Sequence, residues 1–89
     1  MIKYKGGNGS SKQESIIILG ADNEAEGIDA EFNWLEAKYG EENEKWVMVE
    51  QHLLDEGNKQ YDILKIKFLA GDTEDFWFDI TDFYEKDDG

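Results

Sequence analysis

The sequence predicts an α+β fold in which one amphipathic helix packs on an antiparallel sheet. Two observations predict it. One segment repeats apolar residues at spacings of three and four, as a helix face does, and three later segments alternate apolar with polar residues, as strands do. We expect an amino-terminal strand, a helix and a three-stranded meander, in that order. At 89 residues the chain is a single small domain spanning residues 1–89.

The amino-terminal strand is expected at Ile16–Leu19, a short run of β-branched and aliphatic residues. The glycine- and serine-rich stretch 6–12 precedes it. A phosphate-binding loop would place Gly-Lys-Ser/Thr at the start of a helix, whereas here Lys12 follows Ser11 and a strand comes next. We therefore interpret residues 6–12 as a mobile, turn-forming loop rather than a phosphate site.

The helix is expected within residues 22–40. Asn23 followed by Glu26 predicts an amino-terminal cap, and Gly40 predicts the carboxyl-terminal stop. Gly27 in the first turn lowers helix propensity by about 1 kcal/mol relative to alanine. The predicted buried face consists of Ala25, Ile28, Phe32, Leu35 and Tyr39.

Three strand-like segments follow the helix, at 46–54, 61–69 and 76–83. Turn-forming residues at 55–59 and 70–73 separate them, which predicts two consecutive hairpins. Tight turns within these two stretches align the apolar positions of the three segments on one face, and we expect the helix to pack on that face.

A turn at 57–58 predicts that Val47 pairs with Phe68 and Val49 with Ile66 on the face beneath the helix. A three-residue loop at 71–73 would then pair Phe68 with Phe76. The predicted opposite face carries an aromatic cluster formed by Trp46, Met48, Tyr61, Trp77 and Phe83. Residues 1–19 could cover this face, or it could bind a ligand, a partner or a second copy of the chain.

Composition restricts the function classes. The chain has 22 acidic residues against 9 lysines and no arginine, for a net charge of −13. This balance disfavours nucleic acid and anionic membranes as partners and favours a basic protein. The absence of cysteine excludes a disulfide framework and thiolate chemistry.

The acidic residues fall in two blocks, because residues 22–44 hold nine acids against one lysine and residues 72–89 hold eight against one. Together they could form an acidic interaction surface of an inhibitor, an immunity protein or a nucleic-acid mimic. Plain solubility is the alternative. The candidate residues of this surface are Glu24, Glu26, Asp29, Glu31, Glu36, Glu41, Glu42, Asp72, Glu74 and Asp75.

Candidate catalytic and metal-binding groups are few. His52 is the sole histidine and has no partner for nucleophilic catalysis. Residues 22–27 resemble the start of an EF-hand loop, but the twelfth position, which needs a bidentate glutamate, holds Asn33. We expect no enzymatic activity, no cofactor and no metal. A small cation-binding or hydrolytic protein is a third hypothesis, after the acidic and the aromatic surfaces.

The sequence shows neither a signal peptide nor an apolar run long enough to span a membrane. We therefore expect a cytoplasmic protein, either a monomer or a weak homodimer. The acidic tail 85–89 is expected to be mobile.

The segment Tyr4-Lys5-Gly6-Gly7-Asn8-Gly9-Ser10-Ser11 near the start and Phe78-Asp79-Ile80-Thr81 near the end resemble a pattern found in a family of small, uncharacterised bacterial proteins. The resemblance covers nearly the whole chain. It implies no activity, substrate or catalytic residue.

Overall fold

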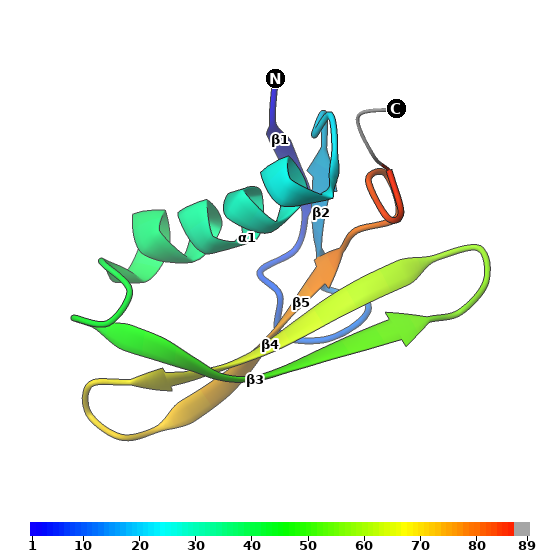
Figure 1. The fold of residues 1–89 in the computed structure, drawn as a ribbon. Helices are drawn as coiled ribbons and strands as arrows, with labels where there is room; N and C mark the ends of the chain where they lie inside the picture. Colours follow the sequence, from blue (N-terminus) through cyan, green and yellow to red (C-terminus); the bar gives the residue numbers. More distant parts are fainter. Residues whose placement is uncertain (87–89) are drawn as a thin grey trace.

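One helix lies on one face of a five-stranded mixed sheet (Figure 1). The computed structural model describes residues 1–86. Spatial order in the sheet is β1-β2-β5-β4-β3, with β2 and β5 parallel and the other neighbours antiparallel. The elements in chain order are β1 (Lys3–Gly6), β2 (Ile16–Leu19), α1 (Glu24–Tyr39), β3 (Trp46–Asp55), β4 (Gln60–Phe68) and β5 (Thr73–Asp79).

The predicted α+β class is confirmed, with the expected strand, helix and three-stranded meander. The sheet is mixed and not antiparallel as predicted, because β2 pairs with β5 in the parallel direction. Strand β1 is an addition to the predicted elements. It pairs with β2 through residues such as Tyr4 and Ile18. The hydroxyl of Tyr4 donates to the backbone oxygen of Ala30, 2.7 Å away, which ties this edge strand to the helix.

The stretch 6–12 is anchored by backbone hydrogen bonds. Gly7 N donates to Ser15 O at 3.1 Å and Gly9 N to Glu14 O at 2.6 Å. Trp77 N of β5 donates to Gly9 O at 2.8 Å, so the loop continues the line of backbone bonds along β5 beyond β2. Its expected mobility stays a prediction. The predicted mobile tail lies partly outside the described residues, which end at residue 86.

Both predicted ends of the helix are confirmed. The side chain of Asn23 accepts a hydrogen bond from Glu26 N at 2.9 Å, which satisfies one of the first free N–H groups of the helix. Gly40 ends the helix with a φ of 98°, and its N–H donates to Glu36 O. This left-handed backbone region favours glycine.

The buried face of the helix differs from the predicted one. Leu35 is buried as expected, and Phe32 and Tyr39 pack against the core, but Ala25 and Ile28 are exposed. The remaining buried positions of the helix are Gly27, Ala30 and Glu31.

Gly27 explains part of the difference between the predicted and the observed buried face of the helix. A Cβ atom placed on Gly27 would stand 2.4 Å from the ring of Phe83, and Phe83 is 2% exposed. The aromatic ring therefore rests directly on the helix backbone, where no larger residue would fit. The absent side chain turns the start of the helix so that Gly27, rather than Ala25 or Ile28, faces the core.

A bulge in β3 overturns the predicted register at the start of that strand. Trp46 pairs with Phe68 and Met48 with Ile66, and the register shifts by one residue between Met48 and Glu50. Val47 and Val49 are consequently exposed, contrary to the prediction. From Glu50 onward the predicted pairing is correct, because the extra residue at the bulge has already been absorbed.

The register between β4 and β5 also differs from the predicted one. Phe76 pairs with Leu64 instead of Phe68, a displacement of four positions along β4. Because side chains alternate with a period of two, an even displacement leaves every residue on its predicted face. Phe76 and Phe78 accordingly remain in the core, at 1% and 0% exposure.

Candidate functional site

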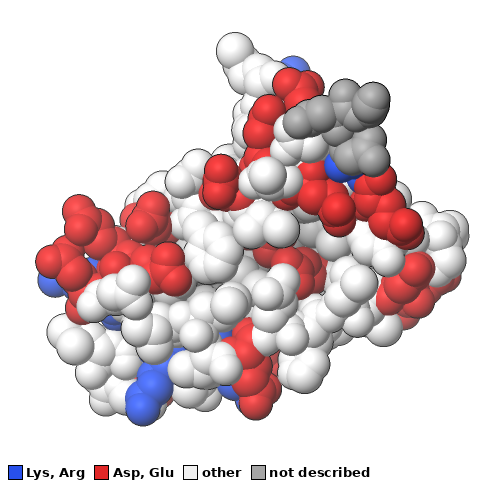
Figure 2. Space-filling model, viewed as in Figure 1, with Lys and Arg blue, Asp and Glu red and all other residues white. Residues whose placement is uncertain are grey.

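The predicted acidic residues do not form one surface. Glu31 is 1% exposed, so its expected place on the helix exterior is wrong. Glu42 is half-buried. The others are exposed: Glu24, Glu26, Asp29, Glu36, Glu41, Asp72, Glu74 and Asp75. Figure 2 shows acidic side chains gathered toward the two ends of this face, with a mainly uncharged stretch between them.

One gathering lies where the carboxyl-terminal segment 80–86 packs on the start of α1. Glu24 N donates to Lys86 O at 3.1 Å, and Gly20 N donates to the Asp82 carboxylate at 3.1 Å. The Lys86 ammonium donates a hydrogen bond to the backbone oxygen of Ala21, 3.0 Å away. We call this gathering the acidic end, and it comprises Asp22, Glu24, Glu26, Asp55, Asp82 and Glu85.

Tyr84 marks the middle of the acidic end. Partial loss of solvent, followed by the nearby charges of Glu85, Asp55 and Glu24, raises the pKa of the Tyr84 hydroxyl. These three acidic residues come from three different segments of the chain and all influence the Tyr84 hydroxyl. The two acidic blocks of the sequence, residues 22–44 and 72–89, therefore adjoin at this end of the helix.

A second gathering lies near the carboxyl end of the helix. Glu42 N donates to the Glu36 carboxylate at 3.4 Å, and the charge of Glu74 contributes, after burial, to a raised pKa of Tyr39. Asp75 pairs in register with Lys65 on the opposite face of the sheet. Glu36 and Glu42 are therefore separated from Glu24 and Glu26 by most of the length of the helix.

Beneath the helix, Glu31 faces Asp62 of β4. Both carboxyl groups are buried, with the two residues 1% and 4% exposed. Gln51 Nε2 donates to both oxygens of Asp62, each at 3.0 Å. Within residues 1–86 no donor reaches either oxygen of Glu31. Burial, followed by the contact with Asp62, raises the pKa of Glu31 to about 10, so this side chain holds a proton at neutral pH.

This carboxyl pair lines a cavity of about 160 Å³. The cavity lies between the helix, strands β3 and β4, and the segment 80–86. Its polar lining is Glu31, Asp62 and Gln51 together with Glu24 and Tyr84, and its apolar walls are Ile28, Leu53, Ile80 and Phe83. Glu24 belongs to the acidic end and Tyr84 lies at its centre, so the cavity and the acidic end are one continuous site.

The sequence contains a signal for this pair that charge alone conceals. Glu31 is four residues after Gly27 and four before Leu35, which places all three on one face of a helix. Asp62 alternates with Leu64 and Ile66 and therefore shares their face. The sequence interpretation placed Glu31 on the exposed side of the helix, because charged residues are seldom fully buried.

The predicted aromatic cluster is divided between the two faces of the sheet. Trp46 is 2% exposed on the helix side, where it stacks on Phe32 with ring centroids 6.2 Å apart. Its indole Nε1 donates to Gly40 O at 2.7 Å. Met48 and Phe83 also pack on that side. The prediction that these three residues share an outer face with Tyr61 and Trp77 is therefore wrong.

Tyr61 and Trp77 do lie together on the opposite face, with ring centroids 5.9 Å apart in an edge-to-face arrangement. Lys12 covers part of this pair, because its ammonium lies 6.0 Å from the Tyr61 ring centroid and pairs with Glu56. Tyr61 is 5% exposed, whereas Trp77 is half-buried. The loop thus covers Tyr61 and leaves Trp77 as the more accessible ring.

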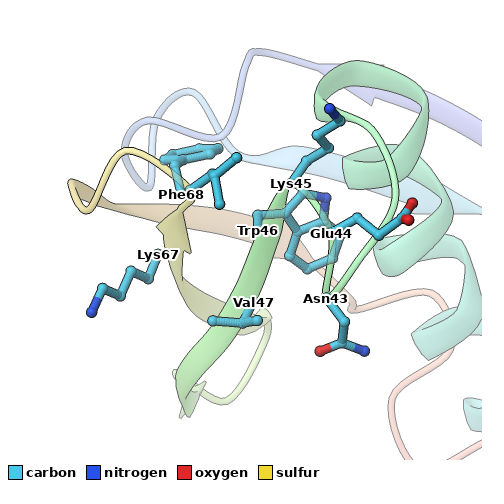
Figure 3. A pocket seen from close by; sticks show the side chains of 8 residues that line it. Asn43, Glu44, Lys45, Trp46, Val47, Lys67 and Phe68 are labelled. Atoms are coloured by element: carbon cyan, nitrogen blue, oxygen red, sulfur yellow. The ribbon is translucent and has the colours of Figure 1, made fainter.

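A larger cavity of about 280 Å³ lies at the start of β3. The ring of Trp46 forms one wall, and Val47 and Phe68 line it as well. Figure 3 shows the side chains of Lys45 and Lys67 pointing away from each other. Its charged groups diverge, so this cavity lacks the converging polar contacts that orient a ligand.

Residues 1–86 contain no group of three or more histidine, cysteine or acidic side chains that could hold a metal ion. His52 lies 3.4 Å from the Glu50 carboxylate, and both side chains are more than half exposed. In the same part of the chain, no helix is long and apolar enough to cross a membrane.

The chain was compared with models of known protein families, with curated proteins and with solved structures, and none of the three comparisons finds a match.

Proposed function

We propose that this chain is a non-catalytic interaction domain that binds a basic protein through its acidic end. The observation that carries the proposal is the junction of the two acidic blocks, where Glu24 N donates to Lys86 O at 3.1 Å beside Tyr84. Clustered like charges disfavour the compact state by mutual repulsion. A basic partner would relieve that repulsion, and the long-range field would speed its association.

Inhibitors, immunity proteins and nucleic-acid mimics act in this way, and the proposal places the chain in that class. Because the chain lacks cysteine, a reducing compartment suits it, and we place the interaction in the cytoplasm. Solubility alone would require only a high net charge. It would not require that charges from the helix start, from β3 and from the segment 80–86 meet at one point.

The test uses octalysine as a basic probe in an NMR titration. We expect backbone shifts to concentrate at the acidic end and the affinity to fall at least tenfold between 50 and 300 mM salt, because exposed charges are screened over roughly 10 Å. Substitution of Glu24→Gln with Glu26→Gln should weaken binding several-fold.

The matched control is Glu41→Gln with Glu42→Gln, which makes the same change in net charge at the other end of the helix. If both pairs weaken binding equally, the probe responds to overall charge and the proposal fails. Shifts spread evenly over both ends of the helix would lead to the same conclusion.

A second candidate function is homodimer formation or ligand binding on the outer sheet face at Trp77. The half-buried state of this ring, beside the covered Tyr61, favours it. Sedimentation equilibrium of the wild type and of Trp77→Ala would test self-association. A monomer in both proteins up to millimolar concentration, together with wild-type tryptophan emission that added sugars leave unchanged, would eliminate this candidate.

A further inference from the structure

We propose that the cavity between α1, β3 and β4 receives the side chain of a single arginine presented by the partner protein. This inference rests on the proposed function, because it specifies what the basic partner inserts beside the acidic end. The proposed function describes the binding surface by its charge alone, and the cavity adds a pocket that would prefer a guanidinium group.

The first argument is the unsatisfied carboxyl group in the wall. Glu31 is 1% exposed, and neither of its oxygens accepts a hydrogen bond from any residue within 1–86. Buried polar groups in native proteins are almost always hydrogen-bonded. The protonated Glu31 can donate to Asp62, but within residues 1–86 neither of its oxygens receives a donor, so the acceptor capacity of Glu31 is open to a donor from outside. Asp62, in contrast, is already held by Gln51.

The second argument is geometric. A guanidinium group offers parallel N–H donors in a rigid fork, which matches the two oxygens of the carboxylate that Glu31 becomes when it ionises. An ammonium group is a point charge and matches this pattern less well. The acceptors at the cavity therefore favour arginine over lysine.

The third argument is size and lining. Pockets for drug-sized ligands enclose about 300–1,000 Å³, whereas this cavity encloses about 160 Å³. It suits one side chain and not a larger molecule. Its apolar walls, from Ile28, Leu53 and Ile80, are suitable contacts for the aliphatic stem of arginine, which packs on apolar surface while its charged head is hydrogen-bonded.

The fourth argument is the path of entry. Glu24 and Tyr84 line the cavity and belong to the acidic end or lie at its centre. An incoming cation would therefore meet attractive charge before it is desolvated. Leu53 is 55% exposed, so this wall of the cavity is open to solvent on the β3 side.

Proton exchange accompanies the binding step. The protonated Glu31 carboxyl would ionise as the guanidinium enters, and its proton would leave to the buffer, so the charge of the arginine is matched by one new carboxylate. The titratable groups that line the cavity with Glu31 are Asp62 from β4, Glu24 from α1 and Tyr84 from the segment 80–86. Because Glu31 is the group that loses the proton, arginine binding should tighten as the pH rises.

The experiment is an NMR titration with the capped peptide acetyl-Gly-Arg-Gly-amide, compared with its lysine and citrulline counterparts. Citrulline keeps the shape of arginine without the charge. We expect shifts in the methyl groups of Ile28, Leu53 and Ile80, with arginine binding more tightly than lysine and with citrulline not binding. Between pH 6 and pH 8 the arginine affinity should rise about tenfold per pH unit, as release of one proton requires.

Glu31→Gln is the decisive variant, and folding is not at risk because the new amide can donate to Asp62. It should lose at least tenfold in arginine affinity and all of the pH dependence. Equal binding of citrulline, a flat pH profile in the wild type, or full affinity in Glu31→Gln would each overturn the inference.

Binding of octalysine distinguishes failure of the arginine pocket from failure of the proposed function. If octalysine still depends on Glu24 and Glu26 while the arginine peptide fails, only the pocket is wrong, and if octalysine fails as well, the proposed function is wrong.

Discussion

Glu31 of α1 and Asp62 of β4 form a buried pair of carboxyl groups, in which Glu31 is protonated at neutral pH and contacts Asp62. Gln51 Nε2 donates to both oxygens of Asp62, whereas no residue within 1–86 donates to Glu31. Glu31 then retains the proton, because burial and the neighbouring charge raise its pKa to about 10. The folded domain therefore carries one proton more at neutral pH than a count of its residues implies.

This pair predicts that stability depends on pH through Glu31. The pKa of Glu31 is raised from 4.5 to about 10 on folding. The stability that the group contributes is complete below about pH 4.5 and is lost as the pH rises toward 10. Within that window the folded state holds a proton that the unfolded state has released, so the free energy of unfolding should fall by about 1.4 kcal/mol per pH unit.

Urea unfolding of the wild type and of Glu31→Gln at several pH values would measure this effect. The variant has no proton to lose at position 31, so its advantage over the wild type should grow as the pH rises from 5 to 9. The comparison cancels the general repulsion among the other carboxylates, which both proteins share. Parallel stability curves for the two proteins would show that Glu31 titrates normally.

Gly27→Ala should destabilise the domain, although alanine is the better helix former. The new methyl would stand 2.4 Å from the Phe83 ring, and that ring is enclosed by the core. Overpacking of this kind costs about 1–3 kcal/mol, which outweighs the gain of about 1 kcal/mol in helix propensity. Asp29→Ala on the exposed side of the same helix is the control and should change stability by less than about 0.5 kcal/mol. A Gly27→Ala protein as stable as the control would contradict the close contact.

Trp46→Phe should cost about 1–3 kcal/mol, measured by thermal or urea unfolding. The substitution removes the hydrogen bond to Gly40 O and leaves that carbonyl at the end of the helix without its donor. Trp77→Phe is the matched control, because Trp77 is half-buried on the other face and contacts Tyr61 in an edge-to-face arrangement. We expect the control to cost clearly less. A larger loss in Trp77→Phe would place the more important indole on the outer face.

The helix limits and the two faces of β4 and β5 were predictable because their signals are local. Asn23 and Gly40 mark the ends of α1 through backbone geometry that those residues favour. A period-two pattern, however, cannot distinguish registers that differ by an even number of residues. Phe76 is therefore in the core whether it pairs with Phe68, as predicted, or with Leu64, as observed.

The candidate site was less predictable, for two physical reasons. The bulge between Met48 and Glu50 reverses the faces of the residues before it, and valine suits a strand on either face, so Val47 and Val49 conceal the change. A glutamate on a helix is expected to be charged and exposed to solvent, which is why Glu31 was predicted on the helix exterior. Burial beside Asp62 instead neutralises it, and a neutral carboxyl is far cheaper to bury than a charged one.

Deletion of Val49 should leave the fold intact and increase self-association. Strand β3 is an edge of the sheet, and a bulge on an edge strand interrupts its regular line of free N–H and C=O groups. Removing the extra residue would join Met48 directly to Glu50 while each keeps its present partner, so Trp46 would remain beneath the helix. We expect unchanged tryptophan emission, with dimers or larger species at high concentration in sedimentation experiments. Val49→Ala keeps the bulge and should behave as the wild type. A deletion variant that unfolds would show that the bulge is required for the twist of β3, and one that stays monomeric would show that the bulge does not guard this edge.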